Sequence, residues 1–274
     1  MGRLKHAIDS LRLLCTKNPE NALELAQTLG KTNLERQKIV EEVVIHSKSV
    51  AEENNNQIIV IAHESYHEGV IGLAASKLVE EYYRPAIVLS IDGKSSKASG
   101  RSITGFNIIE AIQSLDNIIE QGGGHPMAAG FSIKTAKIEE FSIAINDYGK
   151  KLLTKKILTP SLKADIEIGF KNINYPLVRK ISEFEPLGMG NPTPFFVTSG
   201  IKVLSARTVG SQNNHLKLKL EKNGKRFDAI AFGMGEKVKK ITDAEDIDVL
   251  YSLEENFWNG DVNIQLKVKD IKTN

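Results

Sequence analysis

The stretch Ile58-Ile59-Val60-Ile61-Ala62 is a short continuous apolar run, which is typical of a strand buried on both faces. Residues 69–83 return to helical spacing, and Pro85 ends that segment. A second apolar run, Ala86-Ile87-Val88-Leu89-Ser90-Ile91, follows directly. A strand, a helix and a strand in this order predict a parallel crossover unit and therefore an α/β domain.

The segments that follow complete this domain. We expect a polar strand over residues 98–103, a helix from about Asn107 and a glycine loop at 122–124. A strand near 129–133 and a helix from about Thr135 come next. The alternation of strands and helices continues to about residue 150.

The sequence of residues 1–54, which precede the apolar run Ile58–Ala62, predicts helices. Asn18-Pro19-Glu20 is a helix start signal, and Gly30 is expected to end that helix. A second helix is expected to begin near Thr32 or Asn33. Because its other face carries many charges, we expect it to bridge two bodies rather than to be buried all round.

The sequence pattern changes to period-two alternation after a basic linker at residues 151–160. Asn223-Gly224 is a strong signal for a two-residue hairpin turn, and residues 176–184 predict one helix. Short segments with period-two alternation fill most of the remaining chain, at residues 162–168, 195–204, 216–220, 227–232, 247–253 and 262–268. These strands predict a small barrel, and an oligonucleotide/oligosaccharide-binding (OB) fold fits best.

The chain has 274 residues, which is enough for two compact domains. We divide it into a helical connector (1–54), an α/β domain (55–155) and a barrel domain (156–274). With 36 basic and 34 acidic residues the net charge is +2, so any basic surface must be local. No apolar run is long enough to cross a membrane, and residues 1–6 lack the apolar core of a signal peptide. The single Cys15 rules out an intramolecular disulfide, so we expect a cytoplasmic location.

The glycine-rich segment Gln121–Phe131 contains the first candidate binding residues. Gly122, Gly123 and Gly124 permit left-handed conformations, so that consecutive N–H groups can converge on an anion. His125 adds a titratable donor at the edge of this loop. The alternative is a flexible turn with a surface histidine.

The second candidate segment is Lys97–Ser102. Arg101 offers a planar fork matched to phosphate, and the hydroxyls of Ser99 and Ser102 with the N–H of Gly100 would complete a cradle. The alternative is an edge strand with a solvated arginine.

The third segment, residues 64–72, runs from a strand end into a helix. Ligand sites in α/β sheets favour this position, so His67 is a candidate for contact with a substrate. A metal site with His63 is the alternative. We expect no metal there, because Gly69 and Gly72 place the helix start after His67.

In their order along the chain, residues 67–72, then 99–102, then 122–125 with 128–130, the three segments resemble the DHH-associated domain of the DHH phosphoesterase superfamily, and within it the RecJ family most of all. The C-terminal segments 185–192, 228–233 and 256–260 are similar to the RecJ OB barrel. The resemblance covers essentially the whole chain. It implies α/β plus all-β classes: a helical connector, a DHH-associated α/β domain and an OB-fold-like barrel.

The resemblance also implies the substrate-binding part of a 5′-to-3′ single-stranded-DNA exonuclease of DNA repair and recombination. Arg101, with Ser99 and Ser102, would bind the terminal phosphate, and residues 122–125 a phosphate near the metals. Arg36 and His67 are weaker candidates for phosphate contacts. None of these residues would act as a nucleophile or a base.

In the barrel, bases are expected to stack on aromatic side chains while cationic side chains follow the backbone. Trp258, next to a predicted turn, is our first choice for exposure. The alternative for any aromatic residue is a place in the core. The other aromatic candidates are Phe195, Phe196, Tyr251 and Phe257, and the cationic ones are Lys217, Lys219, Lys225 and Arg226.

The metal ligands of the resembled family include an Asp-His-His triplet, and this sequence has no such triplet and no adjacent histidines. We therefore expect Mn²⁺ or Mg²⁺ to be bound by a domain absent from this chain, and the chain alone to be inactive. Expected partners are single-stranded DNA and a single-strand-binding protein or a helicase, but no membrane. The alternatives are a DHH-type phosphoesterase for cyclic dinucleotides or short oligonucleotides, a tRNA-synthetase-linked editing domain, and a non-enzymatic single-strand-binding or partner-docking module.

Overall fold

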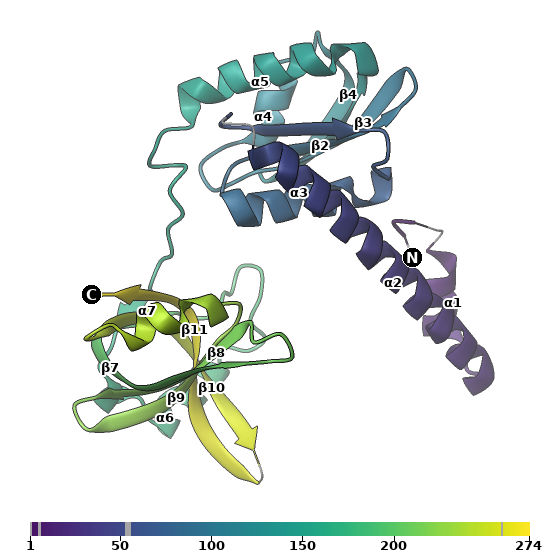
Figure 1. Cartoon of the computed structure of the whole chain (residues 1–274). Coiled ribbons are helices and arrows are strands. Elements are labelled where there is room, and N and C mark those ends of the chain that lie inside the picture. Colours follow the sequence, from purple (N-terminus) through teal and green to yellow (C-terminus); the bar gives the residue numbers. More distant parts are fainter. Residues whose placement is uncertain (1, 5–6, 53–55, 259) are drawn as a thin grey trace. The chain divides into compact units, whose positions relative to one another are not determined.

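The structure is a computed structural model that describes residues 2–4, 7–52, 56–258 and 260–274, without the side chain of Trp258. The chain divides into two compact units, Met1–Pro160 and Ser161–Asn274. Each unit is described by itself (Figure 1).

The first unit is built on a five-stranded sheet with the order β1-β2-β3-β5-β4. Strands β1 and β2 are parallel and the other neighbours are antiparallel, which confirms the predicted crossover unit. The strands are β1 (Ile59–His63), β2 (Ala86–Asp92), β3 (Ser95–Arg101), β4 (Ile119–His125) and β5 (Ala128–Lys134). The helices that pack on this sheet are α3 (Glu68–Tyr82), α4 (Ile108–Gln113) and α5 (Ile138–Leu152), the last preceded by the 3-10 turn Thr135–Lys137.

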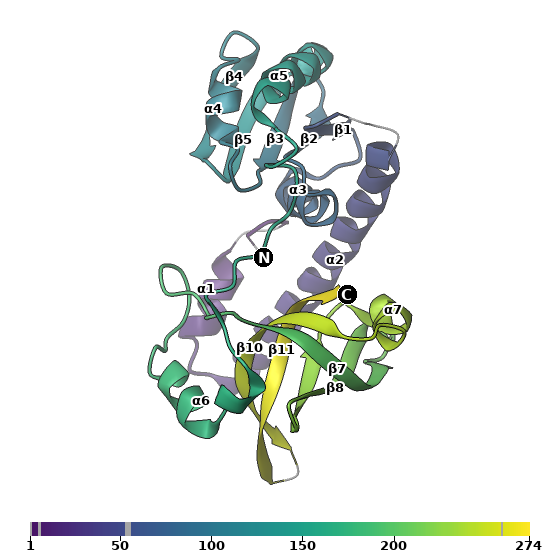
Figure 2. The same ribbon diagram turned by 90° about the vertical axis from the view of Figure 1, so that its left-hand side faces the viewer.

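Helices cover both faces of this sheet (Figure 2). Ile87 and Leu89 of β2 belong to the core shared with α4 and α5. Ala86 and Val88 belong to the core under α3 and the end of α2 (Pro19–Glu52). A strand buried on both faces needs apolar side chains at every position, which is why its sequence is a continuous apolar run.

The N-terminal helices are α1 (Ile8–Cys15) and the long α2. The side chain of Asn18 caps α2, because its Oδ1 accepts hydrogen bonds from the backbone N–H groups of Glu20 and Asn21 at 2.9 and 3.3 Å. The prediction that Gly30 ends this helix was wrong, since α2 runs through it without a break. A glycine ends a helix by adopting a positive φ, and Gly30 keeps a negative one at a cost of about 1 kcal/mol relative to alanine.

The prediction of a glycine loop at 122–124 was also wrong, because these residues lie within β4. They pair with Phe131, Gly130 and Ala129 of β5, and β4 is the edge strand of the sheet. The N–H groups of successive residues point to opposite sides of a strand, so they cannot converge on one anion. Two of the glycines serve packing instead, because a Cβ on Gly122 would lie 2.9 Å from the Cβ of Phe131 and one on Gly124 would lie 2.3 Å from the carbonyl oxygen of Ala128.

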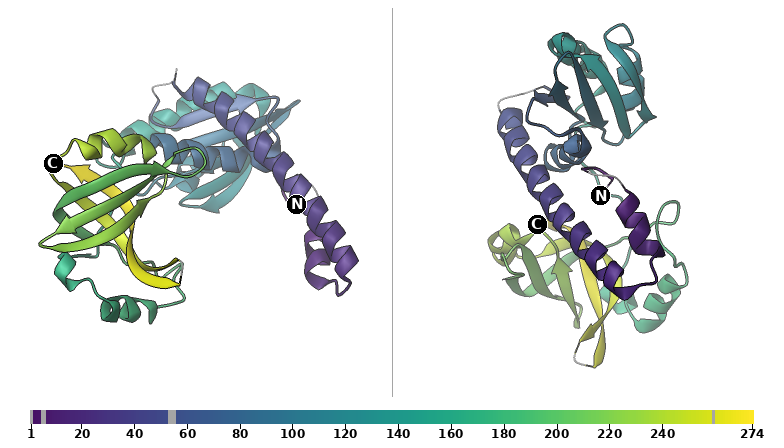
Figure 3. Two further views of the ribbon diagram at one scale, coloured as in Figure 1. Left: turned by 60° about the horizontal axis from the view of Figure 1, so that its bottom comes forward. Right: turned by 90° about the vertical axis from the view of Figure 1, so that its right-hand side faces the viewer.

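The second unit is the predicted barrel, drawn in green to yellow in Figure 3. Its sheet has the order β10-β11-β9-β8-β7-β6, and pairing of β10 with β7 closes it. The strands are β6 (Ile166–Glu167), β7 (Phe196–Val209), β8 (His215–Lys222), β9 (Lys225–Ala231), β10 (Ile247–Trp258) and β11 (Asp261–Thr273). The predicted helix is α6 (Tyr175–Ser182), whereas α7 (Val238–Thr242) and the 3-10 turns Phe170–Asn172 and Gly235–Lys237 were not predicted.

The β8–β9 hairpin confirms the turn predicted from Asn223-Gly224. Asn223 has φ 52° and Gly224 has φ 78°, so both central residues are left-handed. A two-residue turn with this geometry matches the right-handed twist of the two strands it joins.

Two aromatic candidates for base stacking, Phe196 and Tyr251, lie in the barrel core, so these two predictions were wrong. Both side chains point inward from strands that close the barrel. The hydroxyl of Thr198 donates its single proton to the carbonyl oxygen of Ile168 at 2.6 Å. The Tyr251 hydroxyl, 2.7 Å from Thr198 Oγ1, therefore donates to Thr198 Oγ1. Burial raises the pKa of Tyr251 to about 12.

We predict that Tyr251→Phe lowers the free energy of unfolding of the barrel by about 1 kcal/mol at pH 7, because one buried hydrogen bond is lost. The stability that Tyr251 supplies is fully present below pH about 10 and falls as the pH rises towards about 12, because the unfolded chain releases the tyrosine proton first. The variant should therefore lose less stability than the parent in this range. Urea unfolding followed by circular dichroism at pH 7, 9 and 11 measures both effects.

Tyr175→Phe is the matched control. Tyr175 is exposed, and its hydroxyl donates to the carbonyl oxygen of Val262 at 2.6 Å on the surface of the same unit. Equal alkaline slopes for the parent and Tyr251→Phe would show that the buried hydroxyl does not control this transition.

Candidate functional site

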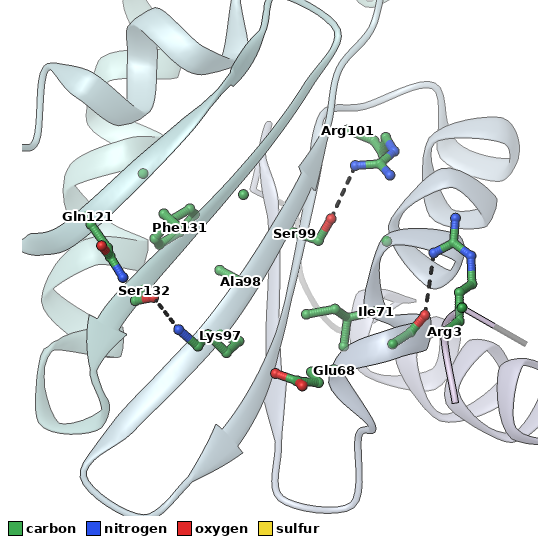
Figure 4. Close-up of a pocket in the computed structure, with 15 residues that line it drawn as sticks. Arg3, Glu68, Ile71, Lys97, Ala98, Ser99, Arg101, Gln121, Phe131 and Ser132 are labelled. Carbon is green, nitrogen blue, oxygen red and sulfur yellow. Dashed lines mark hydrogen bonds between the residues drawn. The ribbon is translucent and has the colours of Figure 1, made fainter. Parts of the chain in front are cut away.

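The first unit contains a groove of about 680 Å³ between the N-terminus of α3 and the sheet (Figure 4). We call it the arginine groove. It is lined by Gly2, Arg3, Glu68, Gly69, Ile71, Gly72, Lys97, Ala98, Ser99, Arg101, Gln121, Gly122, Gly130, Phe131 and Ser132. Its charged side chains are those of Arg3, Lys97, Arg101 and Glu68, so positive charge predominates.

Strand β3 supplies the central side chains of the arginine groove. Because side chains alternate along a strand, Lys97, Ser99 and Arg101 share the face that borders the groove. Ser102 follows on the opposite side, where it is buried and its hydroxyl donates to the carbonyl oxygen of Phe106 at 2.6 Å. The structure thus brings Ser99 and Arg101 together and separates Ser102 from them.

Gly100 also takes no part in lining the arginine groove. A Cβ on this residue would lie 2.8 Å from Cδ1 of Ile108, so the glycine lets α4 pack closely on β3. Since β3 lies between β2 and β5, its N–H groups serve the strand ladders and are not available to a ligand.

Arg101 forms hydrogen bonds within its own strand and lies against Gly72 of α3. Its Nη1 donates to Ser99 Oγ at 3.1 Å and to the carbonyl oxygen of Gly100 at 2.8 Å. A Cβ on Gly72 would lie 2.9 Å from both Arg101 Nη2 and Ser99 Oγ. Gly72 therefore provides the space that this pair occupies.

Arg3 is the second arginine of the groove, and it is not among the residues predicted from the sequence. Its Nη1 donates to the carbonyl oxygen of Gly69 at 3.3 Å, which holds the side chain beside the start of α3. The only signal was Gly2-Arg3-Leu4, which looks like part of the connector and not of a site. The predicted candidate Arg36 lies outside the groove on α2, where Nε and Nη2 donate to Asn33 Oδ1 at 3.2 and 3.0 Å.

The electrostatics of the arginine groove favour an anion. The pKa of Arg101 is lowered below its ordinary value. Burial of the guanidinium is the larger cause, and the positive charge of Arg3 is the smaller one. Within the described ranges, no carboxylate forms an ion pair with either arginine. Two guanidinium groups that form no ion pair with a carboxylate repel each other, and a bound anion would relieve this repulsion.

The remaining candidates lie at the margin of the groove or outside it. His67 is exposed and caps α3, because its Nδ1 accepts a hydrogen bond from the backbone N–H of Gly69 at 3.0 Å. Gly122 lines the groove, whereas Gly123, Gly124 and His125 continue along the exposed edge of the sheet. The side chain of Trp258 lies outside the described residues.

A metal site would require a cluster of ligands. In the part of the chain that the structure describes, no group of three or more His, Cys, Asp or Glu side chains is arranged to hold a metal ion. The described residues therefore do not fit a Mn²⁺ or Mg²⁺ centre. Among the same residues, no helix combines the length and apolar character needed to cross a membrane.

Comparison with known proteins follows the division into two units. The DHHA1 domain family matches residues 55–151, and the RecJ OB domain family matches residues 164–270. The single-stranded-DNA-specific exonuclease RecJ of Bacillus subtilis is 31% identical over 98% of this chain and 35% of its own length. RecJ of Haemophilus influenzae is 28% identical over 99% of this chain and 49% of its own length.

A crystal structure of Thermus thermophilus RecJ in complex with Mg²⁺ matches 99% of this chain and 41% of that chain, with 25% identity and a TM-score of 0.81. The same protein has also been solved with Mn²⁺. This chain spans about a third to a half of the length of the curated relatives it matches.

The groove on the sheet can be tested through Gly72. We predict that Gly72→Ala folds but is stabilised less by inorganic phosphate than the parent is, because the new methyl group displaces Arg101 and Ser99. The shift in melting temperature on addition of phosphate is the measurement. Gly30→Ala is the matched control, since nothing lies within 4 Å of the added methyl group in α2. Equal phosphate shifts for both variants would contradict the role given to Gly72.

A DHHA1 domain followed by a RecJ OB domain, with similarity along almost the whole chain, identifies this chain as the counterpart of the C-terminal part of RecJ single-stranded-DNA-specific exonucleases.

Proposed function

We propose that this chain is the substrate-binding part of a RecJ-like 5′-to-3′ single-stranded-DNA exonuclease that acts in DNA repair and recombination. The observation that carries the proposal is the meeting of Arg3, Ser99 and Arg101 in the arginine groove of the first unit. Their ligand would be the terminal 5′-phosphate of a single strand. The barrel would bind the nucleotides that follow.

The chemistry of a strand end supports this assignment. A terminal phosphate carries about −1.5 to −2 charges at pH 7, whereas an internal phosphodiester carries about one. A pair of guanidinium groups and a hydroxyl group match the higher charge and the additional oxygen atoms of the terminal group. A site of this kind would distinguish a phosphorylated 5′ end from the interior of the strand.

The edge strand β4 borders the same groove through Gly122. We propose that the exposed edge from Gly123 to His125 contacts a second phosphate, which the absence of side chains at Gly123 and Gly124 allows to come close. His67, exposed at the start of α3, is a weaker candidate for such a contact. A divalent metal, Mg²⁺ or Mn²⁺ as in the Thermus structures, would supply the hydrolytic chemistry from outside the described residues.

The protein would act in the cytoplasm, where a single-strand-binding protein or a helicase would supply the substrate. None of the described residues is proposed to act as a nucleophile or a base. Its own residues bind the strand, orient its end and hold the terminal phosphate.

We predict that Arg101→Ala and Arg3→Ala each weaken binding to a 5′-phosphorylated oligonucleotide by roughly 10- to 100-fold, because each removes charge-assisted hydrogen bonds. Binding to the unphosphorylated twin should change much less. Fluorescence anisotropy with both oligonucleotides at two salt concentrations measures the difference. Arg36→Ala is the matched control, since it removes an arginine of the same unit that lies outside the groove.

Equal losses for the two oligonucleotides would mean that the arginines are general backbone contacts. If Arg36→Ala alone removed the preference for the phosphate, the site would lie on α2 and not in the arginine groove.

We also predict that the purified chain does not release nucleotides from single-stranded DNA in the presence of Mn²⁺, because its described residues offer no cluster of metal ligands. The measurement is the appearance of labelled mononucleotides over time. Mn²⁺-dependent release that persists through stringent purification would overturn this prediction.

A further inference from the structure

Phe232 is an aromatic side chain that the barrel leaves on its surface. It follows directly after β9 and is 54% exposed, although burying a phenylalanine ring normally stabilises a protein. Its ring is not isolated. The His215 ring meets it edge to face with centroids 5.1 Å apart, and Lys267 Nζ lies 5.8 Å from its centroid.

The surroundings of Phe232 follow from the register of the strands. Ala229 and Ala231 of β9 point into the core, so Ile230 and Phe232 point outward. Ile230 pairs with Lys217 of β8 on one side and with Lys267 of β11 on the other. The outer face therefore presents a ring and an isoleucine between two lysines.

The positive charge extends across the neighbouring strands. Arg207 of β7 is opposite Lys217, and Lys219 lies two residues along β8 on the same outer face. The acids that face these cations are Asp228, opposite Lys219, and Glu254, 3.8 Å from Lys267 Nζ. Cations thus outnumber acids around the ring.

The turn that follows Phe232 is bonded to the histidine that contacts its ring. The backbone N–H of Gly233 donates to His215 Nδ1 at 3.1 Å, which ties the imidazole to the turn that follows Phe232. Gly233 has φ 72°, a conformation that a residue with a side chain rarely adopts, so this turn requires a glycine. A surface that is ordered in advance loses less entropy on binding.

We propose that Phe232 is a base-stacking platform, on which one nucleobase of a single strand lies while Lys217 and Lys267 bind the adjacent phosphates. This inference rests on the proposed function, because it assumes that the barrel binds a single strand. An exposed ring bordered by cations matches a base bordered by phosphates. A protein partner fits less well, since one ring among charges offers no extended apolar patch.

Phe257 provides a built-in comparison. It is more exposed, at 71%, and lies on β10 near the end of the β10–β11 hairpin. Among the described residues it has no ring or cation contact of the kind that surrounds Phe232. If exposure alone made a platform, Phe257 would be the better one.

The experiment is anisotropy of the full chain with an unphosphorylated oligothymidylate. We expect Phe232→Ala to weaken binding about tenfold, which is typical for the loss of one stacked base. Phe232→Trp should retain the affinity, and its added fluorescence should be quenched by the oligonucleotide. Phe257→Ala should stay within about twofold of the parent, and all variants should keep the parent melting temperature because both rings are exposed.

An oligonucleotide with abasic sites separates stacking from a structural effect. The parent should lose affinity for it, and Phe232→Ala should then bind it as well as the parent does, because no base remains to stack. Equal tenfold losses on the normal and abasic strands would overturn the platform, and so would an effect of Phe257→Ala as large as that of Phe232→Ala.

The same measurements distinguish a missing stacking platform from a barrel that binds no single strand. Unchanged binding by Phe232→Ala, together with an intact preference for a 5′-phosphate, would overturn the platform alone. Absence of binding to any strand by the parent chain would overturn both.

Discussion

The burial of β2 on both of its faces is the constraint on which the first unit depends. Alternate side chains of this strand, such as Ile87 and Val88, belong to different cores, so helices must cover both sides of the sheet. The parallel pairing with β1 then requires a crossover, and α3 is that crossover. Its start is brought onto the face of β3, where Gly72 allows the helix to contact Ser99 and Arg101.

The same packing leaves positive charge without a carboxylate partner among the described residues. Arg101 is half-buried, its hydrogen bonds go to Ser99 and to a carbonyl oxygen, and Arg3 adds a second charge from the N-terminal segment. Structural arginines are normally paired with carboxylates when they are buried. An unpaired arrangement costs stability, and such a cost is common at sites where a ligand completes the charge balance.

The barrel differs from the first unit in how its core is closed and in which side chains its outer face exposes. Its core is closed by the pairing of β7 with β10, and the buried hydroxyl of Tyr251 is satisfied by Thr198. Its outer face presents Lys217 and Lys267 on the two sides of Ile230, together with the exposed ring of Phe232. The ring of Phe232 is 54% exposed beside Lys267, which is the observation on which its proposed role in base stacking rests.

The sequence by itself determined the elements whose signal is local. A change of apolar period predicts β1, α3 and β2, and Asn223-Gly224 predicts its turn from the backbone preference of two residues. Only the tertiary structure decided which distant residues meet. Arg3 joins Arg101 in one groove, Ser102 is buried with its hydroxyl bonded to the carbonyl oxygen of Phe106, and residues 122–124 become an edge strand. Period and propensity encode the face on which a side chain lies, but the partner of that face is set by packing between segments that are far apart in the chain.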